Sequence, residues 1–137
     1  MQQQDQFVLN YMNWLGHFEF GLNQKPFFLG DEQILDTMQR YPITEINYWL
    51  LTWKNYYQNV LGHVCGNVIL VNFENFCAAP DMQLSALFSK IGVQDQCNQL
   101  KLFRPALKSA ENIDHSILEG CNAIYQELAG QSKNQLA

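Results

Sequence analysis

Hydrophobic positions recur at helical spacing after Pro42, and this is the clearest pattern in the chain. Thr44 is suited to cap a helix that begins there and ends near Gly62. We expect Trp49 and Trp53 to be core residues on its apolar face, packed against a strand over residues 68–71. The residues of that face are Ile46, Trp49, Leu50, Trp53, Tyr57, Val60 and Leu61. The residues expected to face away are Glu45, Asn47, Lys54, Asn55 and Gln58.

Four other segments are predicted to be helical. They are residues 5–15, 31–40, 80–91 and a last helix from about Asp114. Pro80 suits a first helical turn, and Gly92 suits a helix end in the left-handed conformation. Gly130 is expected to follow the last helix. The inward positions of the helix over 80–91 are Leu84, Leu87, Phe88 and Ile91. Those of the last helix are Ile117, Leu118, Cys121, Ile124, Tyr125 and Leu128.

A continuous branched run, Val68-Ile69-Leu70-Val71, lies between Gly66-Asn67 and Asn72. Such a run predicts a strand buried on both faces, as in a parallel sheet. One strand leaves its backbone groups without neighbours, so a partner chain or a missing part of a larger α/β protein would have to supply them. The pattern therefore predicts a mainly helical chain with one clear buried strand.

Composition limits the classes of function. The chain has 137 residues, which fits a single domain over 1–137, and only 15% of them are charged. The net charge of −5 and the scattered Lys and Arg argue against a nucleic-acid partner. The N-terminal segment resembles neither a signal peptide nor a membrane span, so a cytoplasmic location without membrane attachment is expected. The four cysteines lack metal-site spacing and are expected to be free thiols, and no metal is expected.

The order of motifs from Tyr48 to Val93 resembles the C-terminal part of the sulfotransferase family. An aromatic helix precedes the apolar run that ends in Phe73-Glu74-Asn75-Phe76, where many family members have Tyr-Glu-Asp-Leu. Pro80 and Ile91-Gly92-Val93 follow in the family's order. The N-terminal YMNWLGHFEFG and the closing ILEGCNAIYQELAG are similar to segments of a bacterial branch. The likeness covers nearly the whole chain as a C-terminal sulfotransferase-like segment, a partial domain. It implies a fold that is α/β by ancestry, mainly helical in content and with one clear buried strand.

The resemblance implies transfer of a sulfuryl group from 3′-phosphoadenosine 5′-phosphosulfate to a hydroxyl or amine. The family's phosphate loop and 3′-phosphate motif are absent, so we expect no catalytic residues here and an inactive isolated chain. Phe73 matches a family tyrosine near the adenine, and Arg104 lies where some members place a basic loop near the 3′-phosphate. His17 and Glu19 are candidates for acceptor contact. The acceptor itself is not specified by the sequence.

Alternatives remain open at several positions. Trp49, Trp53 and Tyr57 line either an acceptor pocket or, as such spacing more often indicates, the core. Glu74 suits backbone hydrogen bonds better than the role of a base. The chain is either a sulfotransferase segment whose other half is missing or separately encoded, or a non-enzymatic helical protein-interaction module; a complete small enzyme of another kind fits less well. The open strand edges predict self-association or marginal folding when the chain is alone.

Overall fold

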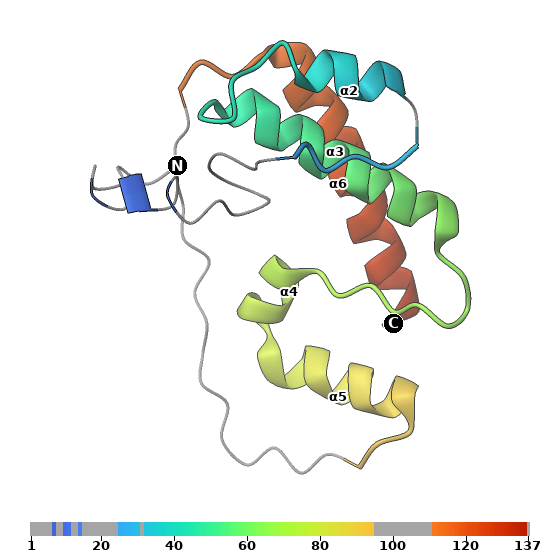
Figure 1. Ribbon diagram of the computed structural model, residues 1–137. Coiled ribbons are helices and arrows are strands. Elements are labelled where there is room, and N and C mark those ends of the chain that lie inside the picture. The colour runs from blue at the N-terminus through green and yellow to red at the C-terminus, as the bar shows by residue number, and fades with distance from the viewer. Residues whose placement is uncertain are drawn as a thin grey trace. The chain divides into compact units, whose positions relative to one another are not determined.

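The computed structural model describes residues 25–30, 32–94 and 111–136, together with the helical residues Phe7, Asn10, Tyr11 and Trp14. Figure 1 shows the helices α2 (Glu32–Met38), α3 (Ile46–His63), α4 (Phe73–Ala78), α5 (Pro80–Ile91) and α6 (His115–Gln135). The chain divides into two compact units. Unit 1 is Met1–Gly62 with Ala110–Cys121, and unit 2 is His63–Ser109 with Asn122–Ala137. No described helix is both long enough and apolar enough to cross a membrane.

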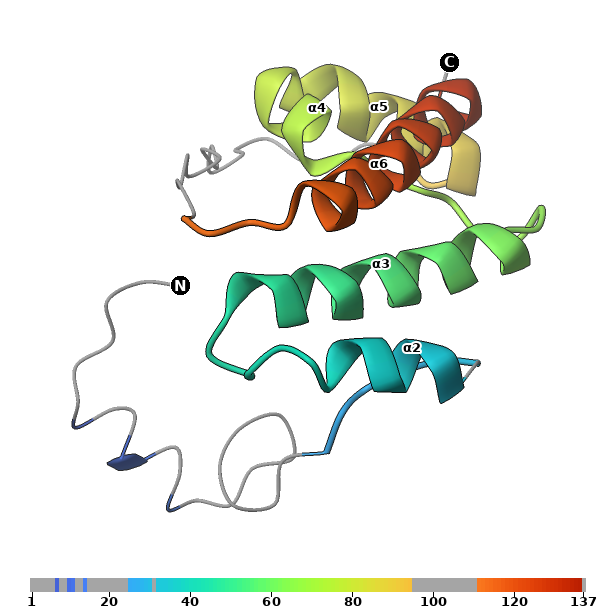
Figure 2. The same ribbon diagram turned by 90° about the horizontal axis from the view of Figure 1, so that it is seen from above.

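Unit 1 is built on α2, α3 and the first turns of α6. Figures 1 and 2 both show α2 alongside α3. The buried core side chains of this unit are Met38, Tyr48, Leu51, Ile117 and Cys121. Around them pack half-buried side chains, namely Phe28, Ile34, Tyr41, Ile43, Trp49, Leu50 and Trp53. The predicted helices over 31–40 and 44–62 are therefore present. Both tryptophans pack half-buried against the core, but the strand on which they were predicted to pack is not formed by residues 68–71.

The face that α3 buries differs from the predicted one. Its buried residues are Asn47, Tyr48, Leu51 and Asn55, which fall within an arc of roughly 100° on a helix with 3.6 residues per turn. The prediction that Asn47 and Asn55 face away was wrong, since each side chain is only 5% exposed. The physical reason is that the nitrogen and the oxygen of each amide are both hydrogen-bonded to backbone groups of other segments, which offsets the cost of burying them.

The predicted buried strand is absent, and with it the α/β assignment. None of the residues that the structure describes forms a strand. Val68 and Val71 are 38% and 44% exposed, so the run is not buried on both faces. The segment remains extended but is followed at once by α4, because the side chain of Asn72 caps that helix by accepting from Asn75 N–H at 2.9 Å. The preference of branched residues for strands depends on what packs around them, so the run of residues alone does not specify a sheet, which explains the error.

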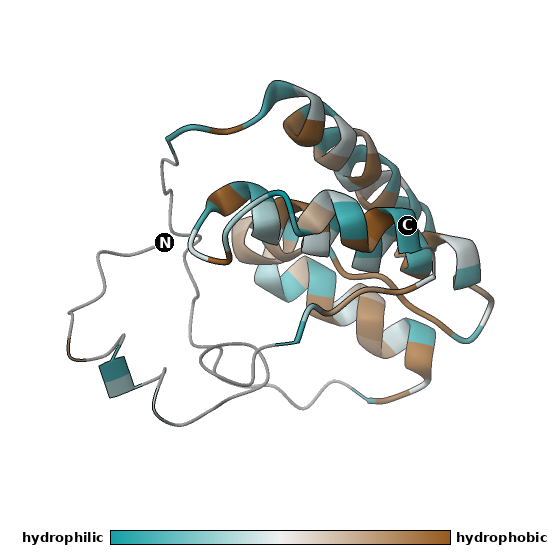
Figure 3. Ribbon diagram, turned by 45° about the horizontal axis from the view of Figure 1, so that its top comes forward, coloured by the Kyte–Doolittle hydropathy of each residue, from teal (hydrophilic) through white to brown (hydrophobic). Residues whose placement is uncertain are grey.

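Unit 2 contains α4, α5 and the rest of α6. Pro80 opens α5 and Gly92 ends it with φ 71°, in the left-handed region, as predicted. Its expected inward residues Leu84, Leu87 and Phe88 are half-buried, whereas Ile91 is exposed. Figure 3 shows hydrophobic and hydrophilic residues mixed along the helices of the chain, as in amphipathic helices.

The last helix is longer than predicted. Asp114 caps it, because its Oδ1 accepts from Ser116 N–H at 2.9 Å and from Ile117 N–H at 3.4 Å. Gly130 lies inside α6 rather than after it. A mid-helix glycine costs about 1 kcal/mol relative to alanine. The turn beyond it carries Ser132 and Gln135, whose contacts with the 68–72 segment offset that cost.

The predicted first helix, residues 5–15, is described at four positions only. Phe7, Asn10, Tyr11 and Trp14 are helical there. The rings of Phe7, Tyr11 and Trp14 follow one another along the helix, and the centroids of neighbouring rings are 6.3 Å apart in both pairs. The four positions are spaced i, i+3, i+4 and i+7 and so share one helical face.

Candidate functional site

Of the four residues predicted from the sulfotransferase resemblance, the structure describes Phe73 alone. His17, Glu19 and Arg104 lie outside the described residues. Phe73 is the first residue of α4, and its ring is 52% exposed. The neighbouring Glu74 accepts a hydrogen bond from the Tyr125 hydroxyl at 3.1 Å. This contact involves a side-chain donor, whereas the sequence had favoured backbone donors at the turn.

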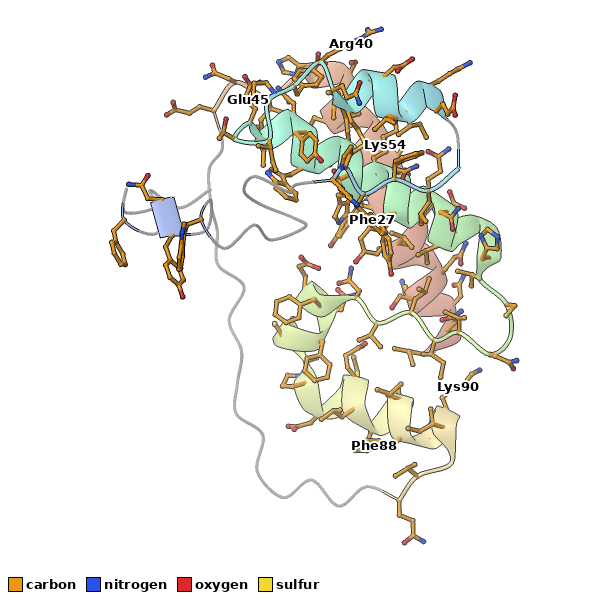
Figure 4. The ribbon with its side chains drawn as sticks, viewed as in Figure 1. Phe27, Arg40, Glu45, Lys54, Phe88 and Lys90 are labelled. Atoms are coloured by element: carbon orange, nitrogen blue, oxygen red, sulfur yellow. The ribbon has the colours of Figure 1, made fainter. Side chains whose placement is uncertain are left out.

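A small cavity of about 160 Å³ lies between α2 and α3. Its lining residues are Ile34, Thr37, Leu51, Lys54, Asn55 and Gln58. Two of its polar groups already serve the fold, because the Thr37 hydroxyl donates to the Gln33 carbonyl and the Asn55 amide binds Leu29. Lys54, labelled in Figure 4, reaches from α3 to the backbone of Gly120. The absent side chain of Gly120 leaves room for the ammonium group.

Cys121 is the buried thiol of unit 1, and its environment suits a structural role. Its Sγ–H donates to the Leu50 carbonyl at 3.4 Å. Burial raises the pKa of the thiol, and the nearby Lys54 charge opposes this only in part. A raised pKa lowers the thiolate fraction and hence the nucleophilicity of the sulfur.

Two asparagines on α3 act as backbone clamps within unit 1. Asn55 Oδ1 accepts from Leu29 N–H at 2.6 Å, and its Nδ2 donates to the Leu29 carbonyl at 2.8 Å. Asn47 Nδ2 donates to the Asn112 carbonyl at 3.0 Å, and its Oδ1 accepts from Asp114 N–H at 2.9 Å. Each amide thus satisfies one donor and one acceptor of a loop that has no helical partner of its own.

Asp114 is the carboxylate whose pKa departs clearly from its usual value among the described residues. Hydrogen bonds from Ser116, and then from the Tyr41 hydroxyl at 3.1 Å, hold the pKa of Asp114 below its usual range. The same bond raises the pKa of Tyr41. Both shifts follow from contacts that fix the start of α6 against the turn before α3, so they indicate a structural role.

The extended segment 68–72 is held along one edge by side chains of α6. Gln135 Oε1 accepts from Leu70 N–H at 2.7 Å, and Gln135 Nε2 donates to the Val68 carbonyl at 3.2 Å. Ser132 Oγ accepts from Asn72 N–H at 3.1 Å. The bonded residues are alternate ones, as in a strand, where successive residues direct their backbone groups to opposite edges. A helix therefore supplies the partners that the sequence had assigned to neighbouring strands.

The opposite edge of the same segment belongs to Ile69 and Val71. Among the residues that the structure describes, none forms a hydrogen bond with the backbone of either one. No charged side chain occurs between Lys54 and Glu74, and proline is absent from that stretch as well. These are the two residue types that commonly protect a free strand edge from pairing. This edge, defined by Ile69 and Val71 and called the open edge below, is the candidate functional site.

The residues that build this site were not found from the sequence, although one signal points to them. The inward stripe of α6 runs through Ile117, Cys121, Ile124 and Leu128 at spacings of three and four. Continued at that spacing, it reaches Ser132 and Gln135. Polar side chains at inward positions need buried partners, and here the partners are backbone groups of the extended segment.

Comparison with known proteins adds no family. No protein-family model, curated protein or solved structure matches the chain. The sulfotransferase resemblance, the co-substrate 3′-phosphoadenosine 5′-phosphosulfate and the roles suggested for Phe73, Arg104, His17 and Glu19 stay predictions.

Proposed function

We propose that this chain is a helical protein-interaction module that binds an extended peptide segment along the open edge of Ile69 and Val71. The observation that carries the proposal is the one-sided pairing of residues 68–72. Side chains of α6 bond the Val68 carbonyl and the N–H groups of Leu70 and Asn72, whereas no described residue bonds the backbone of Ile69 or Val71 on the other edge. An extended peptide placed there would exchange N–H···O=C bonds with both open-edge residues, as in strand addition.

The arrangement favours binding because the segment is already fixed. Three hydrogen bonds to α6 hold its backbone, and the turn bond from Val68 N–H to the Cys65 carbonyl at 2.9 Å fixes its start. A preorganised edge avoids much of the conformational entropy that a flexible loop would lose on binding. The exposed side chains of Val68 and Val71 then offer apolar contacts to the incoming strand.

The chemistry of the site indicates which peptides would bind. The segment carries no charge over residues 64–73, so a peptide with charges at its centre would lose their hydration without gaining an ionic partner. A peptide of β-branched, uncharged residues without proline fits best, since each of its residues can extend and donate.

The test is a titration of the ¹⁵N-labelled chain with the capped peptide Thr-Val-Thr-Val-Thr, followed residue by residue. We expect saturable shifts of the Ile69 and Val71 amides and slower hydrogen exchange at both. The same peptide N-methylated at its central residues has lost donors and should leave these amides unchanged.

Two variants at one position control for side-chain effects. Val71→Thr keeps the N–H and the branched shape, so binding should persist, whereas Val71→Pro removes the N–H and should weaken it at least about tenfold. Shifts spread over the chain without a change at the open edge, or equal binding by both variants, would refute the proposed function.

A further inference from the structure

We infer that the occupant of the open edge is a second copy of the same segment, paired antiparallel about a two-fold axis at Leu70. This inference rests on the proposed function and names its partner. It starts from the alternation already described: Leu70 directs its N–H to Gln135, while its neighbours Ile69 and Val71 face the opposite edge, where no residue in the described part of the chain bonds their backbone.

The open edge is complementary to itself. In an antiparallel pair centred on Leu70, Ile69 of one copy faces Val71 of the other, and each such pair of residues exchanges two N–H···O=C bonds. The two Leu70 residues then form the central non-hydrogen-bonded pair, where side chains approach most closely. A two-fold arrangement uses the same patch on both copies and closes after two chains, which prevents further growth along this edge.

The distribution of charge limits where two copies can approach one another. Each chain has a net charge of −5, so two copies repel one another over most of their surfaces. Residues 64–73 contain no charged side chain and therefore offer a stretch on which two copies can approach without an ion losing its hydration. A strand edge with no lysine or proline to protect it is open to pairing with another chain, and a second copy presents the same edge.

The size of the contact predicts a weak, reversible dimer. The pairing involves a segment of about five residues, which is well below the area buried in stable dimers. A dissociation constant between about 10 µM and 1 mM is therefore expected, and sedimentation equilibrium covers this range.

The experiment compares the whole chain with its Val71→Pro and Val71→Thr variants by sedimentation equilibrium over that range. We expect a reversible monomer–dimer equilibrium for wild type and Val71→Thr. For Val71→Pro, association should be weaker, with a Kd at least about tenfold higher. A wild-type chain that stays monomeric, or a Val71→Pro variant that dimerises as strongly as wild type, overturns the inference.

A second measurement needs no variant. In a mixture of isotope-labelled and unlabelled chains, isotope-filtered NOEs should connect protons of Leu70 in one copy with those of Leu70 in the other. Dimers that lack these NOEs would use another surface and would overturn the inference as well.

The two proposals fail in distinguishable ways. If wild type is monomeric and the Thr-Val peptide still shifts the Ile69 and Val71 amides, the module binds other chains and self-pairing is wrong. If neither the peptide nor a second copy affects these amides, both proposals are wrong.

Discussion

Replacement of Asn55 by alanine measures how much a buried side-chain amide contributes to unit 1. The change removes two hydrogen bonds, from Leu29 N–H at 2.6 Å and to the Leu29 carbonyl at 2.8 Å. Each is worth about 0.5–1.5 kcal/mol net, and a buried group left without a partner costs about 1–3 kcal/mol more. Leu29 is only half-buried, so water would reach part of its backbone. We therefore expect Asn55→Ala to lower the free energy of unfolding by about 2–4 kcal/mol.

Urea denaturation followed by the fluorescence of Trp49 and Trp53, both packed on the core of the same unit, measures this loss. Gln58→Ala is the matched control, because Gln58 is an exposed position on the same helix and its loss should change stability by no more than about 0.5 kcal/mol. The Leu29 amide should also exchange faster in Asn55→Ala. A loss below about 0.5 kcal/mol with Leu29 still protected would show that Asn55 faces solvent, as the sequence pattern had suggested.

Three further outcomes follow from single contacts. Gly120→Ala should stabilise the chain in thermal melts by about 0.5–1 kcal/mol, because alanine favours α6 and the new Cβ meets only the flexible end of Lys54, at 2.8 Å from Nζ; destabilisation would mean that this lysine is fixed. Gly92→Ala should cost about 1–2 kcal/mol because φ is 71°, whereas Gly66→Ala, where φ is not positive, should cost less; equal losses would contradict the strain argument. The lowered pKa of Asp114 means that its carboxylate stabilises the fold above about pH 4, and that this contribution is lost as the pH falls through the folded-state pKa. The melting temperatures of wild type and Asp114→Asn should therefore differ near neutrality and converge in acid.

The helices followed from local signals in the sequence. Apolar spacing located α3 to within two residues, and Pro80 and Gly92 marked both ends of α5. These signals act within one or two turns of a helix, so they do not depend on the rest of the fold. Gly130 is the exception, because the turn after it is held by side-chain contacts with a segment far away in sequence.

The features that depend on distant contacts did not follow from the sequence. Asn47 and Asn55 look like surface residues until their backbone partners are known, and those partners are 65 and 26 residues away. The run from Val68 to Val71 has the same composition whether strands or a helix satisfies its backbone. The sequence predicted backbone groups of this segment without strand partners. The hydrogen bonds along its other edge depend on Gln135, which lies 65 residues beyond Leu70.

Residue-resolved hydrogen exchange at two protein concentrations tests the account of residues 68–72 most directly. The amides of Leu70 and Asn72, which donate to Gln135 and Ser132, should be protected at both concentrations. The amides of Ile69 and Val71 should exchange almost freely near 10 µM and become protected near 1 mM, the approximate range expected for a contact of this size. Protection of Ile69 and Val71 at the lower concentration, or free exchange of Leu70 and Asn72 at either, would contradict the one-sided pairing on which both proposals rest.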